Sequence, residues 1–125
     1  MRTFSTGATR DDEGDKLDYE GFLSPRVLRH YAEYMHTHRK QADGELRASD
    51  NWQKGIPLDT YMKSLLRHVV SAWEAHREGP EKVAESLYGV LFNTMGYLYE
   101  ITLEDGGAEY ESLPYHQPFI PDEEQ

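Results

Sequence analysis

The chain has 125 residues, of which 38% are hydrophobic and none is cysteine. This length fits one small domain with one core, and the lack of cysteine excludes a disulfide framework, a thiol nucleophile and a Cys-ligated zinc. The formal net charge of −10 argues against a protein that coats duplex DNA, because such a protein needs a basic face. All 13 Lys and Arg precede residue 83, so a local basic pocket for a small anion stays compatible with the composition.

The N-terminal segment, residues 1–23, mixes glycines, hydroxyl side chains and charges without helical or strand periodicity. It has no apolar signal region, and nowhere do 18 apolar residues run together. We therefore expect an irregular arm on a soluble, cytoplasmic protein that does not enter a membrane.

Three long helices are predicted after this arm. The first has Ser24 as its N-cap and Pro25 at its first position, and it continues to about Lys40. A long loop, residues 41–57, leads to a second helix that Asp59 or Thr60 can cap and that ends at Gly79. Its expected core stripe consists of Leu58, Met62, Leu65, Leu66, Val69 and Trp73.

The third helix is expected from near Glu81 to about Leu103 and is apolar around most of its circumference, which predicts a central, buried position. One strip along it differs, because small and polar residues recur there at helical spacing. The members of this strip are Glu85, Gly89, Asn93, Gly96 and Glu100. The strip is either a site of close helix packing or the lining of a pocket, in which Glu85 can bind a divalent cation and Asn93 a base or sugar.

The last segment, residues 104–125, holds three of the six prolines, which excludes helix for most of it. We expect an extended acidic tail whose aromatic residues, Tyr110, Tyr115 and Phe119, pack on a neighbour. The fold class predicted for residues 1–125 is a single all-α domain, a small bundle of three to four main helices with an irregular arm and an extended tail.

Several residues outside the strip suit a phosphate or a base. Arg67 and His68 place a guanidinium and an imidazole side by side in the second helix, although a single flanking histidine is more often a structural residue. In the long loop, Trp52 can stack on a base beside Lys54, or it can close the core over the first helix. Residues 5–10, STGATR, offer hydroxyls and backbone N–H groups beside Arg10. The acidic residues 11–15 lack the spacing of a calcium loop.

Five segments in this order carry a resemblance to a known family: FSTGATRDDEGDKLDYEGFLSP, RHYAEYMHTHR, DNWQKGIP, KSLLRHVVSAWEAHR and ESLYGVLFNTMGYL. Together they cover residues 4–100 and resemble a bacteriophage family named for the N-terminal domain of dATP/dGTP diphosphohydrolases. The resemblance implies a relation to the all-α MazG-like enzymes, which split a nucleoside triphosphate into monophosphate and pyrophosphate with Mg²⁺ or Mn²⁺. It also implies a homo-oligomer, a dimer, in the cytoplasm of an infected bacterium.

The MazG-like motifs are only partly present. Where the family has EExxExxEA, this chain has RHVVSAWEA, in which Glu74 alone matches. Where the family has EELxDVLW, the chain has ESLYGVLF, which retains Glu85. The usual cage of four carboxylates is therefore absent at these positions, so the protein either binds metal differently or binds nucleotide without cleaving it.

The roles that we assign on this resemblance are expectations. The catalytic and metal-binding residues are Glu85, Glu33 and His68. The substrate-binding residues for a purine nucleotide are Arg10, Lys16, Lys54 and Arg67 on phosphate, and Trp52 and Asn93 near the base or sugar. Besides a nucleotide hydrolase and a protein that binds nucleotide without cleaving it, a third possibility is a protein-binding module. In that module, Trp52 and the C-terminal tyrosines form the interface.

Overall fold

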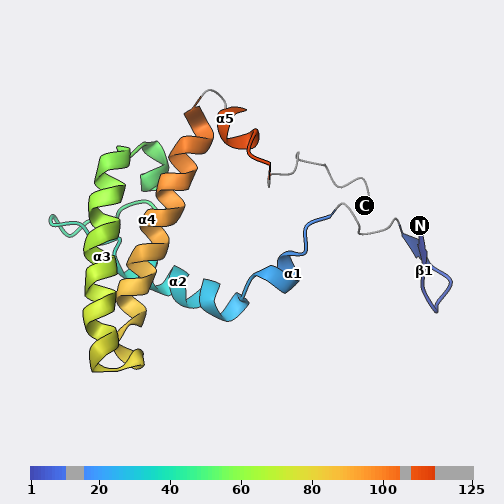
Figure 1. Ribbon diagram of the computed structural model, residues 1–125, viewed down its shortest axis with the longest axis horizontal. Helices are drawn as coiled ribbons and strands as arrows, with labels where there is room; N and C mark the ends of the chain where they lie inside the picture. The colour runs from blue at the N-terminus through green and yellow to red at the C-terminus, as the bar shows by residue number, and fades with distance from the viewer. Residues whose placement is uncertain (11–15, 105–107, 115–125) are drawn as a thin grey trace.

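The computed structural model describes residues 1–10, 16–104 and 108–114 and confirms an all-α chain. The helices are α1 (Tyr19–Phe22), α2 (Pro25–Thr37), α3 (Leu58–Glu78), α4 (Ala84–Leu103) and α5 (Ala108–Glu111), with two 3₁₀ turns, η1 (Asn51–Lys54) and η2 (Pro80–Lys82). Two short strands, β1 (Arg2–Thr3) and β2 (Thr9–Arg10), pair antiparallel. As Figure 1 shows, α3 and α4 form a long antiparallel hairpin, while β1 and α1 extend away from it.

Helix α2 begins as the sequence predicts. The Ser24 hydroxyl accepts a hydrogen bond from the Val27 backbone N–H at 3.2 Å, and Pro25 occupies the first turn, where its missing N–H costs nothing. The helix ends at Thr37, about one turn earlier than expected. Here His38 leaves the helical conformation, and its ring contacts the Tyr34 ring with the centroids 4.3 Å apart.

The ends of α3 and α4 follow the predicted boundaries with two differences. Helix α3 ends before Gly79 as expected, but Pro57, and not Asp59 or Thr60, occupies its N-cap, and no side chain caps it. The residues after Gly79 form one 3₁₀ turn, η2, so α4 starts at Ala84, three residues later than expected. The short connection makes the two long helices antiparallel neighbours.

Two glycines set how closely α3 and α4 approach each other. Gly89 of α4 lies against the ring of His68, and Gly96 lies against the ring of Tyr61. A Cβ at position 89 would stand 2.5 Å from His68 Nδ1, which no real structure tolerates, and a Cβ at position 96 would overlap the Tyr61 ring. Of the two interpretations of this strip, the structure shows close helix packing.

The predicted core face of α3 is wrong for four of its six residues, whereas Leu58 and Leu65 are half-buried as part of the core. The side chains that face α4 are those of Tyr61, His68 and Ala72, whereas Met62, Leu66, Val69 and Trp73 of the expected stripe are exposed. The two sets are offset by one residue, which is about 100° of rotation about the helix axis. The glycines decide between them, because only the rings of Tyr61 and His68 fill the space that the missing Cβ atoms leave.

Helix α4 is also less buried than its composition predicts. Its buried residues are Gly89, Asn93 and Gly96, all on the strip that faces α3, whereas Leu87 remains 51% exposed and Met95, Leu98 and Leu103 are exposed as well. A helix that is apolar all round is therefore covered on only part of its circumference within one chain.

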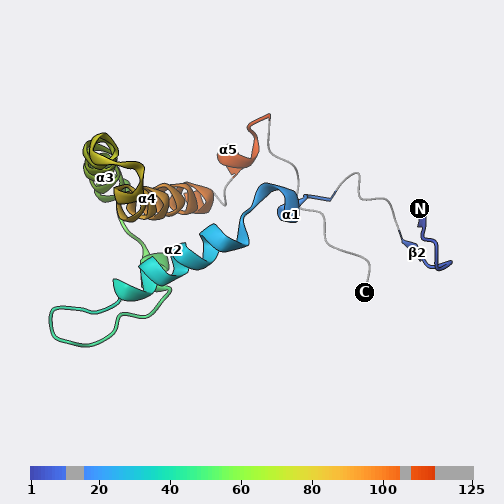
Figure 2. The same ribbon diagram turned by 90° about the horizontal axis from the view of Figure 1, so that it is seen from below.

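The second layer of the fold consists of α2 and η1, which lie on one side of the hairpin (Figure 2). Tyr31 and Tyr34 of α2 contact the Tyr88 ring, with centroids 6.4 and 5.7 Å from it. Trp52 of η1 packs edge-on against Phe92 and Tyr99, at 6.3 and 4.9 Å between centroids. Tyr88, Phe92 and Tyr99 lie on the same side of α4, which explains why both elements pack there.

The N-terminal arm and the C-terminal tail contain more regular structure than expected. The arm forms the β1–β2 hairpin, whose turn includes Gly7 with φ of 91°, and the single helical turn α1. The tail forms one turn, α5, where helix was not expected. The acidic residues 11–15, Tyr115 and Phe119 lie outside the described residues, and so does the side chain of Tyr110. In the described part of the chain, no helix is both long and apolar enough to span a bilayer.

Candidate functional site

Two of the predicted site residues, His68 and Glu85, lie near the point where α2 crosses the hairpin. His68 is half-buried with its imidazole over Gly89, and Glu85 lies one helical turn before that glycine on the same strip of α4. Helix α2 contributes Tyr34, whose ring centroid lies 5.7 Å from that of Tyr88 on α4. The junction of α2, α3 and α4 therefore combines one histidine, one carboxylate and one tyrosine hydroxyl.

Burial and nearby charge at the junction raise the pKa values of its tyrosines. Burial raises the pKa of Tyr34 above its ordinary value of 10.0, and the Glu85 carboxylate raises it further, because ionising the phenol would place a second negative charge nearby. Burial also raises the pKa of Tyr31, with smaller effects from Tyr34 and Tyr61. These phenols are therefore neutral at physiological pH and can donate hydrogen bonds, for example to a phosphate oxygen.

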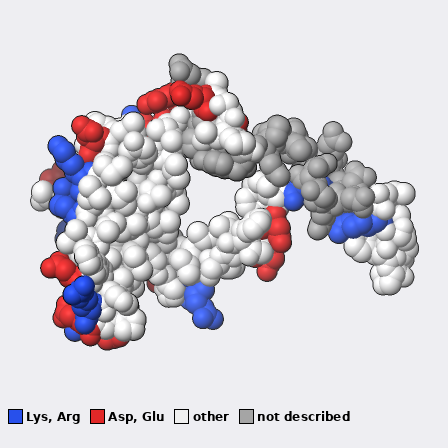
Figure 3. All heavy atoms as spheres, in the orientation of Figure 1, with Lys and Arg blue, Asp and Glu red and all other residues white. Residues whose placement is uncertain are grey.

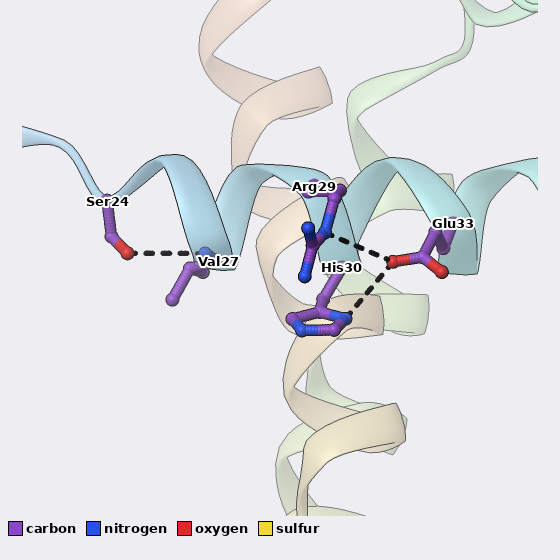
Figure 4. Close-up of polar contacts among 5 residues, drawn as sticks. All are labelled: Ser24, Val27, Arg29, His30 and Glu33. Carbon is purple, nitrogen blue, oxygen red and sulfur yellow. Dashed lines mark hydrogen bonds and ion pairs between the residues drawn. The ribbon is translucent and has the colours of Figure 1, made fainter.

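Glu33 does not join Glu85 and His68. Its Oε1 accepts from His30 Nδ1 at 3.1 Å when that nitrogen is protonated, and it pairs with Arg29 Nε at 3.9 Å (Figure 4). All three side chains lie on α2 itself and are largely exposed. Within the described residues no three His, Asp or Glu side chains are grouped as a metal site requires. The structure therefore does not group Glu85, Glu33 and His68, and their role as metal ligands stays a prediction.

Asn93 is placed for packing. Its side chain is 3% exposed, and its Nδ2 donates a hydrogen bond to the Gly89 carbonyl oxygen at 2.7 Å, one turn earlier on the same helix. A buried amide that is already bonded stabilises the hairpin interior at the point where Gly89 brings the helices together. To contact a base or a sugar, this side chain would have to leave that interior.

Three other residues predicted to bind a nucleotide, Trp52, Lys54 and Arg67, lie on η1 and α3. The indole of Trp52 packs against Phe92 and Tyr99, so it closes the core over α4. The sequence had suggested that it closes the core over the first helix. Lys54 ends η1 and is exposed, and Arg67 is exposed on α3 directly before His68. Both cations remain accessible to an anion.

The arm residues lie apart from this junction. Arg10 is in β2, paired with Arg2 in the register of the hairpin, and Lys16 precedes α1. In the turn of the arm, the Gly7 N–H donates to the Phe4 carbonyl at 2.9 Å and the Phe4 N–H donates to the Ala8 carbonyl at 2.8 Å. Of the N–H groups that a phosphate nest at residues 5–10 would use, that of Gly7 therefore already has a partner.

Sequence reasoning missed a polar group inside the hairpin. Tyr61 is 1% exposed, and its hydroxyl has no hydrogen-bond partner among the described residues. Burial raises its pKa, and Glu100 raises it further. Glu100 itself accepts from the Ile56 backbone N–H at 3.3 Å, which ties the end of the long loop to α4. The spacing of Tyr61 and His68, which places them on one face of α3, is the sequence signal that could have predicted this buried position.

Comparison with protein-family models, with curated proteins and with solved structures gave no match.

Proposed function

We propose that the chain is a nucleotide-handling domain that acts on purine deoxynucleoside triphosphates, dATP or dGTP, and releases the monophosphate and pyrophosphate. The observation that carries the proposal is the junction of α2, α3 and α4, which gathers His68, Glu85 and the Tyr34 hydroxyl from three segments that resemble the phage family. The exposed Arg67 beside His68 supplies a guanidinium for a phosphate group.

The donor set of one chain is too small to enclose a metal ion, since the described residues hold no group of three suitable ligands. Mg²⁺ commonly needs only one or two carboxylates when the phosphates of its substrate complete the shell. Mg²⁺ or Mn²⁺ bound to the triphosphate would supply neutralisation of the phosphate charge. Glu85 is the carboxylate that contacts this complex, Arg67 holds a phosphate oxygen, and the neutral Tyr34 phenol donates a hydrogen bond.

The direct test is incubation of the purified protein with dATP and dGTP in the presence of Mg²⁺ or Mn²⁺, followed by chromatography of the products. We expect monophosphate and pyrophosphate from the native protein and none from the Glu85→Gln variant. Glu81→Gln is the matched control, because Glu81 is an exposed carboxylate four residues earlier in η2. Absence of turnover together with absence of nucleotide binding contradicts the proposal.

A second candidate is a protein that binds a nucleotide and leaves it intact. It is favoured by the separation of Glu33 from Glu85 and His68, because the metal cage on which hydrolysis depends in the resembled enzymes is not assembled here. Calorimetry distinguishes the two candidates. Saturable binding of dATP or dGTP, with chemically unchanged nucleotide recovered afterwards, supports the binder and excludes the hydrolase.

The resemblance also underlies the proposal that the domain acts as a homo-oligomer. The exposed apolar surface supports this view, since Leu66, Trp73 and Leu87 are each more than half exposed in a single chain.

A further inference from the structure

Three polar groups that do not satisfy one another lie at the corner where the long loop enters α3. They are the Ile56 N–H, the Tyr61 hydroxyl and the Glu100 carboxylate. Ile56 directly precedes Pro57, the N-cap of α3, and the Tyr61 N–H donates to the Pro57 carbonyl at 3.3 Å in the first turn of that helix. Two donors at the start of α3 therefore lie beside one acceptor near the end of α4.

The buried Tyr61 hydroxyl lies one helical turn from the origin of the Glu100 side chain. A Cβ added at Gly96 would stand 2.6 Å from the hydroxyl oxygen, so this oxygen lies directly over Gly96. Glu100 follows Gly96 by four residues, and a helical side chain leans toward the N-terminus of its helix, over the preceding turn. Burial raises the pKa of Tyr61, and the charge of Glu100 raises it further. Rotation of the Glu100 side chain therefore brings a carboxylate oxygen to the hydroxyl.

The Glu100 carboxylate holds its present partner by a long hydrogen bond. Its Oε1 accepts from the Ile56 N–H at 3.3 Å, whereas the usual range for an N–H donor ends at about 3.2 Å. Among the described residues no Lys, Arg or His forms an ion pair with Glu100. Helix α4 itself carries no cation, and on the visible face of the hairpin the charged side chains gather at its edge and its ends (Figure 3). No ion pair therefore opposes an exchange of hydrogen-bond partners at Glu100.

We propose that Glu100 is a conformational switch with two positions, which holds the end of the long loop in one and releases it in the other. In the closed position, that of the structure, Glu100 accepts from Ile56 and the buried Tyr61 hydroxyl lacks a partner, which costs free energy. In the released position Glu100 accepts from Tyr61 by a charge-assisted O–H···O⁻ bond, and the Ile56 N–H turns to water. Each position satisfies one donor and leaves the other, so their free energies are close and both are populated.

Release of Ile56 gives the preceding segment, η1, freedom to move. Gly55 joins η1 to Ile56 with φ of 117°, and no atom lies within 4 Å of the place that a Cβ would take there. The backbone therefore has room to turn at Gly55. Trp52 and the exposed Lys54 of η1 move with this turn. The switch depends on these residues alone and stands whether or not the chain binds a nucleotide.

The test is amide hydrogen exchange at Ile56, measured by NMR on the ¹⁵N-labelled full chain with the Val69 amide inside α3 as the internal reference. Tyr61→Phe removes the partner of the released position and should slow the exchange of the Ile56 amide at least about fivefold. Glu100→Ala removes the acceptor of the closed position and should speed it at least about fivefold.

Two matched variants serve as controls. Tyr31→Phe removes the hydroxyl of a half-buried tyrosine on α2, and Glu104→Ala removes an exposed carboxylate four residues after Glu100. Neither group is a partner of Ile56, so both variants should leave the exchange of its amide unchanged.

Tryptophan fluorescence tests whether the loop moves with the switch. In a Trp73→Phe background Trp52 is the single indole of the chain. Quenching of its fluorescence by acrylamide should increase when Glu100→Ala is added, because η1 is then no longer held through Ile56. Addition of Glu104→Ala should leave the quenching unchanged.

The sign of the Tyr61→Phe effect decides between the switch and its alternatives. An unchanged exchange rate at Ile56 would show that the hydroxyl is no alternative partner of Glu100. A faster rate would show that the hydroxyl instead helps to hold Glu100 on Ile56. Either result overturns the proposal, and so does quenching of Trp52 that Glu100→Ala leaves unchanged.

Discussion

The imidazole of His68 occupies the space that a side chain at position 89 would need. A Cβ on Gly89 would stand 2.5 Å from Nδ1 and 2.7 Å from Cγ of that ring. One turn further along α4, the buried Asn93 bonds the Gly89 carbonyl, and Gly96 receives the Tyr61 ring in the same way. The hairpin is therefore held by two rings of α3 that fill two gaps in α4, and its stability should respond sharply to changes at these four positions.

Substitution of Gly89 by alanine should lower the free energy of unfolding by about 1 to 3 kcal/mol, because the new methyl group displaces the imidazole from a closely packed interface. Urea unfolding followed by circular dichroism measures the loss. The effect should be smaller in a chain that also carries His68→Ala, since that change opens the space. If the losses of the two single variants simply add in the double variant, the ring of His68 and Gly89 do not interact, which contradicts their close packing.

Removal of the Tyr61 hydroxyl should not weaken the fold. Tyr61→Phe keeps the ring against Gly96 and Phe92, where the ring centroids of residues 61 and 92 are 6.0 Å apart, and it deletes a buried hydroxyl that has no partner among the described residues. We expect an unfolding free energy that is unchanged or raised by up to about 1 kcal/mol. Tyr61→Ala should cost about 3 to 5 kcal/mol, as the loss of a buried aromatic ring does. A clear loss of stability in Tyr61→Phe would show that the hydroxyl has a partner.

The fold should lose stability in alkali. The pKa values of Tyr31, Tyr34 and Tyr61 are all raised above 10.0 in the folded chain, chiefly by burial. Their contribution is complete below pH 10, where the phenols are neutral in both states, and it is lost above that pH, because the unfolded chain releases these protons first. Unfolding measured at several pH values above 10 should show the decline, and Tyr61→Phe should make it less steep. An unfolding free energy that stays constant over this range would contradict the raised pKa values.

The cap of α2 should affect how firmly this helix stays on the hairpin. Ser24→Ala removes the acceptor for the Val27 N–H and should cost about 1 kcal/mol, whereas Ser24→Asp should preserve the cap. Hydrogen exchange of the amides of α2 measures the effect locally. Ser71→Ala, at an exposed position of α3, is the control and should change α2 exchange little.

The sequence determined the local features of this protein. Ser24 and Pro25 specified the start of α2, Gly79 specified the end of α3, and the apolar periods specified three helices joined by a long loop and a short turn. These signals act within a few residues, through capping hydrogen bonds and backbone restrictions, so they can be recognised in one sequence. The strip of Gly89, Asn93 and Gly96 on α4 can also be recognised in the sequence. The sequence does not show which side chains of α3 pack against it.

Only the tertiary structure decided which faces meet. Sequence hydrophobicity favoured Met62, Leu66 and Trp73 as the core of α3, but Tyr61 and His68 are the residues that face α4. The choice depends on glycines about 20 and 35 residues further along the chain, since the loss of two Cβ atoms there creates gaps of the size of a ring. Likewise, Glu33 was grouped with Glu85 by sequence, yet it pairs with Arg29 and His30 on its own helix. Shape complementarity between segments distant in sequence fixed both outcomes, and it leaves Met62, Leu66, Val69 and Trp73 exposed on α3.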